Sequence, residues 1–486
     1  MNWVPTRRCL SNLLVTLVAV GNIVPAGTQA AESSRYRLKR RQSYHEVADV
    51  RIDYAVQGAL TFPAEKRAEK LALEVTAKLA YQDRLLMSGK MSAGDDLSQR
   101  GDAVKEGMPS IRAARYYDQV DVEITINGQK MAPELRDDRR LLGVSRRNAK
   151  LTYHCPLGSL SREEYDLIHL PCDLYALQLI LPDEPVAIGS TWQQDDSALA
   201  ALLGLDTVGE SDVVSELKNI ERGYAKVELS GNIQGAIAGV ASEIAIKARY
   251  YFDLRRGKIA SLQLVARERR GIGHVNPGVE ATSRLKMTIE PRTDSDELSD
   301  RQVASMRGSA AWENQRLAYH SAALGIALEH DQNWFVTAED DQATVLRRMD
   351  RGELIAQCNV SVLPSLKKGK AVTLAQFQED MRKNLDTNFG TFVNARESTT
   401  SQGYLVYRVE AAGTASQLPV RWIYYLLTDT EGRRVALVFT MEGDLVKPFG
   451  SADRQIVESL AFVERELPEN VTPSEDSSGQ KVVGQP

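Results

Sequence analysis

Two cysteines and two histidines have the residue types and spacing needed to form a covalent cross-link or to hold a metal ion. Cys155 and Cys172 are 17 residues apart. In an oxidising compartment we predict that they form a disulfide, worth about 3 kcal/mol in the loop-entropy model, which leaves Cys358 as a buried thiol. The alternative is a zinc site, because His154 and His169 would complete a set of two imidazoles and two thiolates. The spacing favours the disulfide, since adjacent residues such as His154 and Cys155 point to opposite faces of an extended segment.

A second group of chemically useful side chains lies in residues 269–278, where three glycines accompany two arginines, a histidine and an asparagine. A flexible backbone with cationic donors suits an anion or the carboxylate of a partner. The alternative is a glycine-rich turn at the end of a strand, with exposed arginines that only solvate it. We predict an anion or partner loop formed by Arg269, Arg270, His274 and Asn276.

The sequence contains none of the common motifs of hydrolases, thiol oxidoreductases or nucleotide-binding enzymes. Gly-x-Ser-x-Gly, Cys-x-x-Cys and Gly-x4-Gly-Lys are all missing. His45 and Glu46 begin like the helix of a zinc protease, but Asp49 stands where the second histidine is required. We therefore predict no catalytic residue, no metal and no cofactor, with an enzyme as the third class of function.

Composition limits the class of protein and of partner. The chain has 486 residues, 43% of them hydrophobic, with 60 Lys and Arg against 65 Asp and Glu. The mean hydropathy of −0.31 is typical of a soluble protein. These values exclude a disordered, fibrous or polytopic chain. They also speak against nucleic acid as the main partner, because an acidic chain repels phosphate unless a basic face is segregated from the rest.

Residues 1–30 have the pattern of an export signal. Arg7 and Arg8 precede an apolar run over 13–20, and residues 28–30 read Thr-Gln-Ala, a small-residue cleavage site. The apolar run is well short of the roughly 20 residues that span a bilayer, which argues against the alternative of a retained anchor. We predict an extracytoplasmic protein, periplasmic or secreted, with no transmembrane segment in the mature chain.

Residues 31–295 are predicted to form a domain rich in antiparallel β-strands. Apolar and polar residues alternate over 71–82 and again over 120–126, which ends at an Asn-Gly hairpin signal. Further strands over 244–252 and 259–266 flank the turn signal Asp253–Gly257. Helix is sparse in this half, with one short helix predicted after Ser161, which begins a capping box.

The chain changes character after a polar segment at 296–311, which is predicted to be a linker. Residues 312–465 are predicted to form an α+β domain. Within it, Thr373 caps a helix over 374–387, strands 420–427 and 434–440 form a hairpin, and Ser451 caps a closing helix. Residues 466–486 are rich in Pro, Ser, Glu and Gly, which predicts a disordered tail.

The C-terminal half, 312–465, resembles the PsbP-like α/β/α sandwich family. The resemblance rests on Gly325-Ile326-Ala327-Leu328 followed by Asn333-Trp334, on the helix 374–387, on the hairpin across Gly432, and on the terminal helix around Ile456 to Leu460. It implies a small, generally non-enzymatic interaction module, because members of that family include photosynthetic accessory proteins and a binder of a nuclear-transport GTPase. It implies no ligand-binding residue.

The N-terminal half is similar, as an analogy, to the curved antiparallel sheets of LolA-like lipoprotein carriers, through its long alternating strands and the turn Asp253–Gly257. The fold class predicted for the whole chain is therefore α+β, with a mostly antiparallel sheet followed by a PsbP-like sandwich. We predict an exported, non-enzymatic protein of the cell envelope that binds a partner protein. The alternative is carriage of a lipid or another apolar ligand, if the N-terminal sheet curves around a cavity.

Overall fold

The computed structural model describes residues 34–41, 46–63, 68–89, 110–147, 150–307 and 315–464. The predicted signal segment 1–30, most of the long loop predicted between 88 and 110, and the predicted tail 466–486 lie outside the described residues. None of the described helices is long and apolar enough to cross a membrane.

The first half of the chain forms a sheet of 13 strands, which we call the N-terminal sheet, and neighbouring strands in it are antiparallel. This confirms the predicted antiparallel architecture. The order across the sheet is β10 (Thr191–Gln193), β12 (Val214–Glu221), β13 (Tyr224–Ile237), β14 (Val240–Asp253), β15 (Lys258–Arg270), β16 (Gly278–Arg292), β2 (Val47–Phe62), β3 (Glu69–Gly89), β4 (Ser110–Ile126), β6 (Leu141–Arg147) and β7 (Lys150–His154), while β11 (Thr207–Ser211) pairs with β13 and β5 (Gln129–Met131) pairs with β4.

The turns of this sheet follow the predicted chemistry. Asn127 and Gly128 join β4 to β5 with φ values of 49° and 84°, the left-handed pair that a tight hairpin requires. Between β14 and β15, the side chain of Asp253 accepts hydrogen bonds from the backbone N–H groups of Arg255 and Arg256 at 2.9 and 3.1 Å. The turn closes at Gly257, whose φ is 66°.

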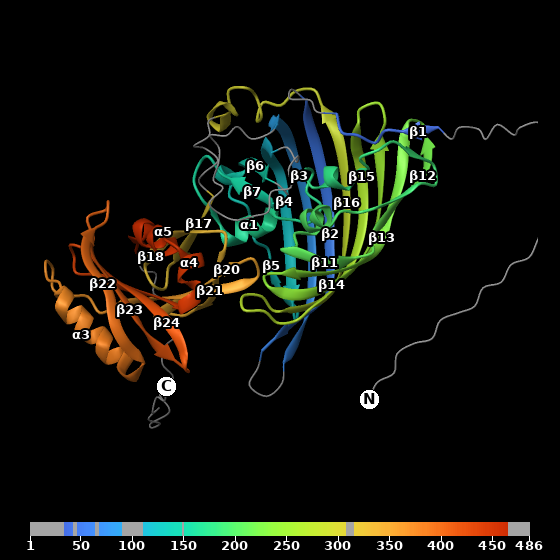
Figure 1. Ribbon diagram of the computed structural model, residues 1–486. Helices are drawn as coiled ribbons and strands as arrows, with labels where there is room; N and C mark the ends of the chain where they lie inside the picture. Colours follow the sequence, from blue (N-terminus) through green and yellow to red (C-terminus); the bar gives the residue numbers. More distant parts are fainter. Residues whose placement is uncertain are drawn as a thin grey trace, which may run out of the picture.

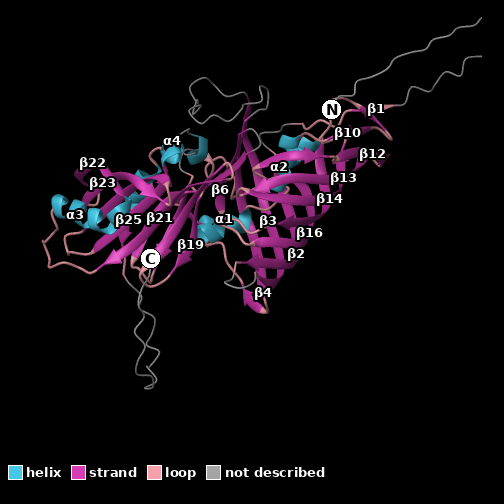
Figure 2. Cartoon of the chain, turned by 60° about the horizontal axis from the view of Figure 1, so that its bottom comes forward, coloured by secondary structure: helices cyan, strands magenta, loops and turns pink. Residues whose placement is uncertain are grey.

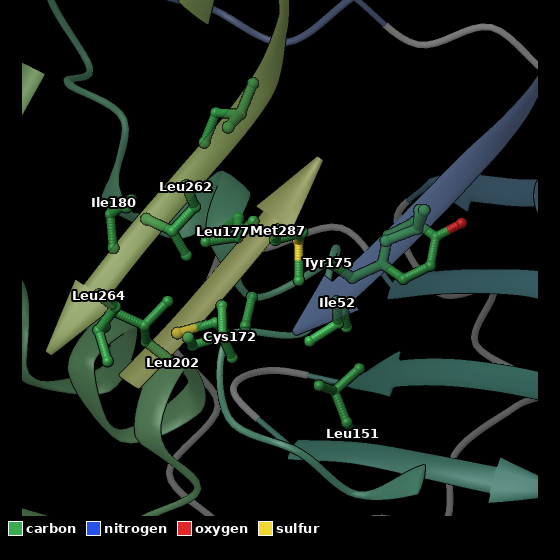
Figure 3. Packing of buried hydrophobic residues seen from close by; sticks show 14 of the residues in the cluster. Ile52, Leu151, Cys172, Tyr175, Leu177, Ile180, Leu202, Leu262, Leu264 and Met287 are labelled. Atoms are coloured by element: carbon green, nitrogen blue, oxygen red, sulfur yellow. The ribbon is translucent and has the colours of Figure 1, made fainter. Parts of the chain in front are cut away.

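One face of the N-terminal sheet, the inner face, is covered by the chain between β8 (Leu160–Ser161) and β11. This covering segment contains α1 (Arg162–Ile168), η2 (Leu177–Ile180), β9 (Val186–Ala187) and α2 (Asp196–Leu203), and β9 pairs with β1 (Arg35–Tyr36). Figure 1 shows the sheet curving around it. In Figure 3, Leu177, Ile180 and Leu202 of the segment lie against Leu262 and Leu264 of β15. Burial of these apolar side chains drives the contact.

Residues 296–307 of the predicted linker pack on the N-terminal sheet. Leu298, Val303 and Met306 form a small buried cluster with Val47 and Ala114, and η3 (Ala304–Arg307) lies within it. The spacing of these apolar residues is too irregular for a helix or strand pattern, which is why the sequence indicated no buried face here.

The second half of the chain is an α+β domain, the second domain, as predicted. Its seven-stranded sheet has the order β19 (Trp334–Glu339), β20 (Ala343–Asp350), β21 (Glu353–Leu363), β25 (Arg434–Glu442), β24 (Leu418–Thr428), β23 (Leu405–Ala415) and β22 (Phe389–Thr399). A smaller sheet contains β26 (Ala461–Phe462), β18 (Ile326–Asp331), β17 (Arg316–Ser321) and β8. The helices are α3 (Leu374–Leu385), α4 (Val446–Phe449) and α5 (Ala452–Ser459). Figure 2 shows these helices as short segments beside the strands.

Helix α3 begins as predicted, because the side chain of Thr373 accepts a hydrogen bond from the backbone N–H of Gln376 at 3.2 Å. It buries Met381 and Leu385. The closing helix α5 is also present, but Ser451 makes no side-chain capping bond to it.

The two halves are joined by a shared sheet and by side-chain hydrogen bonds, among them those of Arg162. Strand β8 of the first half pairs in parallel with β17 of the second. Directly after β8, the guanidinium of Arg162 donates to the backbone carbonyls of Gln332 and Trp334 at 2.6 and 2.9 Å. It also lies 4.4 Å from the centre of the Phe335 ring. These contacts fix the second domain against the covering segment.

Replacing Arg162 with methionine should lower the free energy of unfolding by about 3 kcal/mol or more, because two carbonyls each lose a hydrogen bond from a charged donor and such bonds contribute about 1.5–3 kcal/mol each. Urea denaturation followed by tryptophan fluorescence measures this change. Arg316→Met is the matched control, because Arg316 pairs with Glu329 on the surface at 3.4 Å and such pairs contribute about 0–1 kcal/mol. Equal losses in both variants would show that Arg162 does not hold the joint.

Candidate functional site

The predicted disulfide is absent, since Cys155 and Cys172 are both free thiols. Cys172 is fully buried in the core of the first half, next to Leu202 of α2, whose carbonyl accepts from its backbone N–H at 2.6 Å. Cys155 lies instead beside the carbonyl of Leu141 on β6, 3.8 Å from its sulfur. The residues between them, including α1, carry the two thiols to different neighbours. Burial raises the pKa of the Cys172 thiol to about 12, so it is an inert core residue.

The zinc alternative has no ligand set in the described part of the chain, where no group of three or more His, Cys, Asp and Glu could hold a metal ion. His169 instead packs against two aromatic rings, with its ring centre 5.1 Å from that of Tyr165 and 6.0 Å from that of Tyr153. Desolvation beside these rings lowers the pKa of His169, although the residue keeps an exposed surface.

The free thiols predict a simple labelling result. In denaturant without reductant, an alkylating reagent should modify Cys155, Cys172 and Cys358, because none of these three cysteines forms a disulfide. In the native protein the fully buried Cys172 and Cys358 should remain unmodified. Peptide mass spectrometry reads both experiments, and a non-reduced peptide joining Cys155 to Cys172 would contradict the structure.

Part of the predicted anion loop lies against the second domain. Arg269 is exposed, whereas Arg270 is half-buried near Glu268, with 3.5 Å between the charged groups. The carbonyl of His274 accepts from Arg347 of β20 at 2.6 Å, and the carbonyl of Asn276 accepts from the N–H of Gly273. An anion or partner role for these residues stays a prediction.

A charged cluster lies in the core beneath the inner face. Arg115 of β4 is 1% exposed and bridges two buried carboxylates, Asp83 of β3 at 3.0 Å and Asp173 of the covering segment at 2.8 Å. Its guanidinium also stands 4.1 Å from the centre of the Tyr81 ring. The hydroxyl of Tyr175 donates to Asp83. The cluster therefore ties the covering segment to the sheet.

The cavity next to this cluster is too small for a substrate. It measures about 40 Å³ and is lined in part by Arg40, Asp83 and Tyr175. That volume accommodates about three water molecules. The charges here fit a structural role, because a buried ion pair that loses one partner leaves an uncompensated charge in a low-dielectric core.

The pKa of the Asp83 carboxyl is raised by burial, which outweighs the opposing effect of Arg115. The folded protein therefore keeps this proton to a higher pH than the unfolded chain does. The resulting stability is fully present below the unfolded-state pKa, near 3.9, and is lost as pH rises through the folded pKa.

The free energy of unfolding of the wild type minus that of Asp83→Asn should fall across this window. Chemical denaturation at several pH values measures it, with the exposed Asp121→Asn as control, and a difference that rises with pH would contradict the assignment.

The opposite, outer face of the N-terminal sheet carries an open trough of about 820 Å³. It extends over six neighbouring strands, from β13 through β14, β15, β16 and β2 to β3. The outward-pointing side chains of this outer trough are Glu228, Ser230, Lys247, Arg249, Gln263, Val265, Arg284, Lys286, Asp53, Ala55, Thr76 and Lys78. Five are cationic and two are acidic, an excess of three positive charges.

Strand register sets the pattern of these charges. Val265 of β15 lies directly between Lys247 of β14 and Arg284 of β16. Arg267, also exposed, follows Val265 by two positions and therefore points to the same face. Lys247, Arg267 and Arg284 make no ion pair with any described residue. Val265 is 39% exposed at the centre of the three.

The other charges of the outer trough are partly compensated. Glu228 forms ion pairs with Lys226 at 3.2 Å and with Arg249 at 3.0 Å, and these partners lower the pKa of its carboxyl. Asp53 lies between Lys286 and Lys78 in the strand register. The uncompensated positive charge therefore gathers around Val265.

Sequence reasoning missed the outer trough. Its only local signal is the recurrence of cations at every second position, Lys247 with Arg249 inside the strand predicted over 244–252, and Arg284 with Lys286. Alternation places each pair on the solvent side, but it does not say which strands are neighbours. The trough arises from the pairing of six strands, from β13 to β3.

The comparisons with known proteins add little to this geometry. No protein-family model and no curated protein matches the chain. Among solved structures, the chain is similar to cyanobacterial PsbP of Synechocystis, with 13% identity, 32% of this chain and 99% of that chain covered, and a TM-score of 0.25. It is also similar to the Ran-binding protein Mog1p of Saccharomyces cerevisiae, with 13% identity, 31% and 96% coverage, and a TM-score of 0.25. Likeness at these identities and TM-scores carries no argument about function.

Proposed function

We propose that this chain is an exported, non-enzymatic binding protein of the cell envelope, and that it holds an anionic partner on the outer trough. The observation that carries the proposal is the group of Lys247 and Arg284 in the outer trough with Arg267 beside it, three cations near the exposed Val265 that have no carboxylate partner among the described residues. An unneutralised cationic patch on a chain of net charge −5 is a segregated charge, and such a patch attracts anions from solution.

The alternative of apolar-ligand carriage inside the N-terminal sheet is less well supported. Apolar ligands occupy cavities of about 300–1,000 Å³. The inner face is instead packed with side chains of the covering segment, such as Leu177 and Leu199, and the cavity beside the Arg115 cluster measures about 40 Å³. The larger hollow of about 820 Å³ lies on the outer face and is rimmed by charge.

The second domain, in this proposal, is a PsbP-like α/β/α sandwich that serves as an interaction module. What supports this is the order of strands and helices around its seven-stranded sheet, together with the features of residues 312–465 quoted from the sequence. Arg162 and the pairing of β8 with β17 keep it in a fixed position beside the N-terminal sheet. These contacts join the second domain to the half of the chain that carries the outer trough.

The proposal is tested with immobilised poly-glutamate as the anionic probe. The mature protein should bind it at low salt and lose affinity as salt screens the charges. The triple variant Lys247→Gln, Arg267→Gln, Arg284→Gln should bind about tenfold or more weakly, since each exposed charge contact contributes up to about 1 kcal/mol.

The control variant removes the same net charge from cations that are already paired. Arg51, Lys70 and Lys130 form exposed ion pairs with Glu290, Glu280 and Glu123. Changing these three to glutamine should leave the affinity for poly-glutamate close to that of the wild type. If both triple variants bind equally well, or if the wild type does not bind at low salt, the proposed function is wrong.

A further inference from the structure

The spacing of the charges in the outer trough limits the shape of its partner. We infer that the partner is a protein segment in extended conformation, with Asp or Glu at alternate positions, that lies along β15 between the cations of β14 and those of β16. This inference rests on the proposed function and adds the chemical class of the ligand.

The cations form two columns, and the lane between them is neutral at Gln263 and Val265 but carries Arg267 two positions after Val265. Lys247 and Arg249 stand two positions apart on β14, and Arg284 and Lys286 stand two positions apart on β16. Side chains two positions apart on a strand recur about every 6.7 Å, and two strand spacings separate the columns by about 10 Å. Gln263 and Val265 of β15 form the floor of the lane.

An extended peptide repeats with the same period. Side chains on one side of an extended chain also recur about every 6.7 Å, so carboxylates at alternate positions come into register with a column of cations. The floor suits the rest of such a peptide, because Gln263 offers an amide for hydrogen bonding and Val265 offers an exposed apolar contact. Lys and Arg side chains can reach across half of the lane to carboxylates above it.

The acids of the trough argue against a densely charged partner. Asp53 sits between Lys286 and Lys78, and Glu228 sits at the end of the same row beside Arg249. A polyphosphate, a nucleic acid or an anionic membrane would bring negative charge against both carboxylates, and such like-charge contacts reduce its affinity relative to a ligand that avoids them. A peptide with intermittent acids can place neutral residues there.

The test compares two fluorescent octapeptides of equal composition and charge, one with four Glu alternating with four Thr and one with the four Glu clustered. Fluorescence anisotropy on the mature protein should give about tenfold tighter binding for the alternating peptide. The triple variant Lys247→Gln, Arg267→Gln, Arg284→Gln should remove this preference, and the control variant Arg51→Gln, Lys70→Gln, Lys130→Gln should keep it.

Tripolyphosphate and vesicles of anionic phospholipid serve as competing probes. The inference predicts that both displace the alternating peptide poorly, and that Asp53→Asn improves the binding of tripolyphosphate more than that of the peptide. The inference would be overturned if the two peptides bound equally well, or if tripolyphosphate or the vesicles bound more strongly than the alternating peptide. If that binding were lost in the triple variant, the proposed function would still stand. Failure of every anionic probe to bind at low salt would overturn both.

Discussion

The structure depends on one constraint, namely that successive side chains of a strand point to opposite faces of the sheet. In the N-terminal sheet this constraint separates two sets of residues in the same strands. Leu262 and Leu264 of β15 and Leu285 of β16 point inward and are almost fully buried. Gln263 and Val265, at the alternate positions of β15, point outward and are exposed. The inner set must be covered, and the covering segment with α1, η2 and α2 fills that side. The outer set is then the face that a partner can reach.

Two groups of charge, one on each side of this sheet, have different consequences. On the inner side, Arg115 is held between Asp83 and Asp173, so its charge is used within the fold. On the outer side, Lys247 and Arg284 are left without partners among the described residues and are available for binding. The distinction rests on pairing and burial, and residue type alone does not reveal it.

Features that depend on neighbours in the sequence could be predicted from it. The alternation over 244–252 and 259–266 placed β14 and β15, and the capping residues Ser161 and Thr373 placed the starts of α1 and α3. The turn after Asp253 was equally local, because one side chain accepts the hydrogen bonds that define it.

Features that depend on pairing between distant segments could not be predicted. Nothing near Leu160 indicates that it pairs with Leu317, and nothing near Val265 indicates that Lys247 and Arg284 flank it. The same limit explains the error at Cys172, since sequence spacing gives the length of a loop but not the direction in which each thiol points. The outer trough belongs to this class, because it exists only when six strands, far apart in the sequence, pair in one register.

Chemical footprinting of lysines tests the central claim most directly, because it shows where an anionic partner sits on the folded protein. Acetylation with and without poly-glutamate, read by peptide mass spectrometry, should show protection of Lys247 and Lys286 in the outer trough and none at Lys70 and Lys130, which are exposed but already paired. Protection confined to other lysines, or equal protection of all four, would contradict the account.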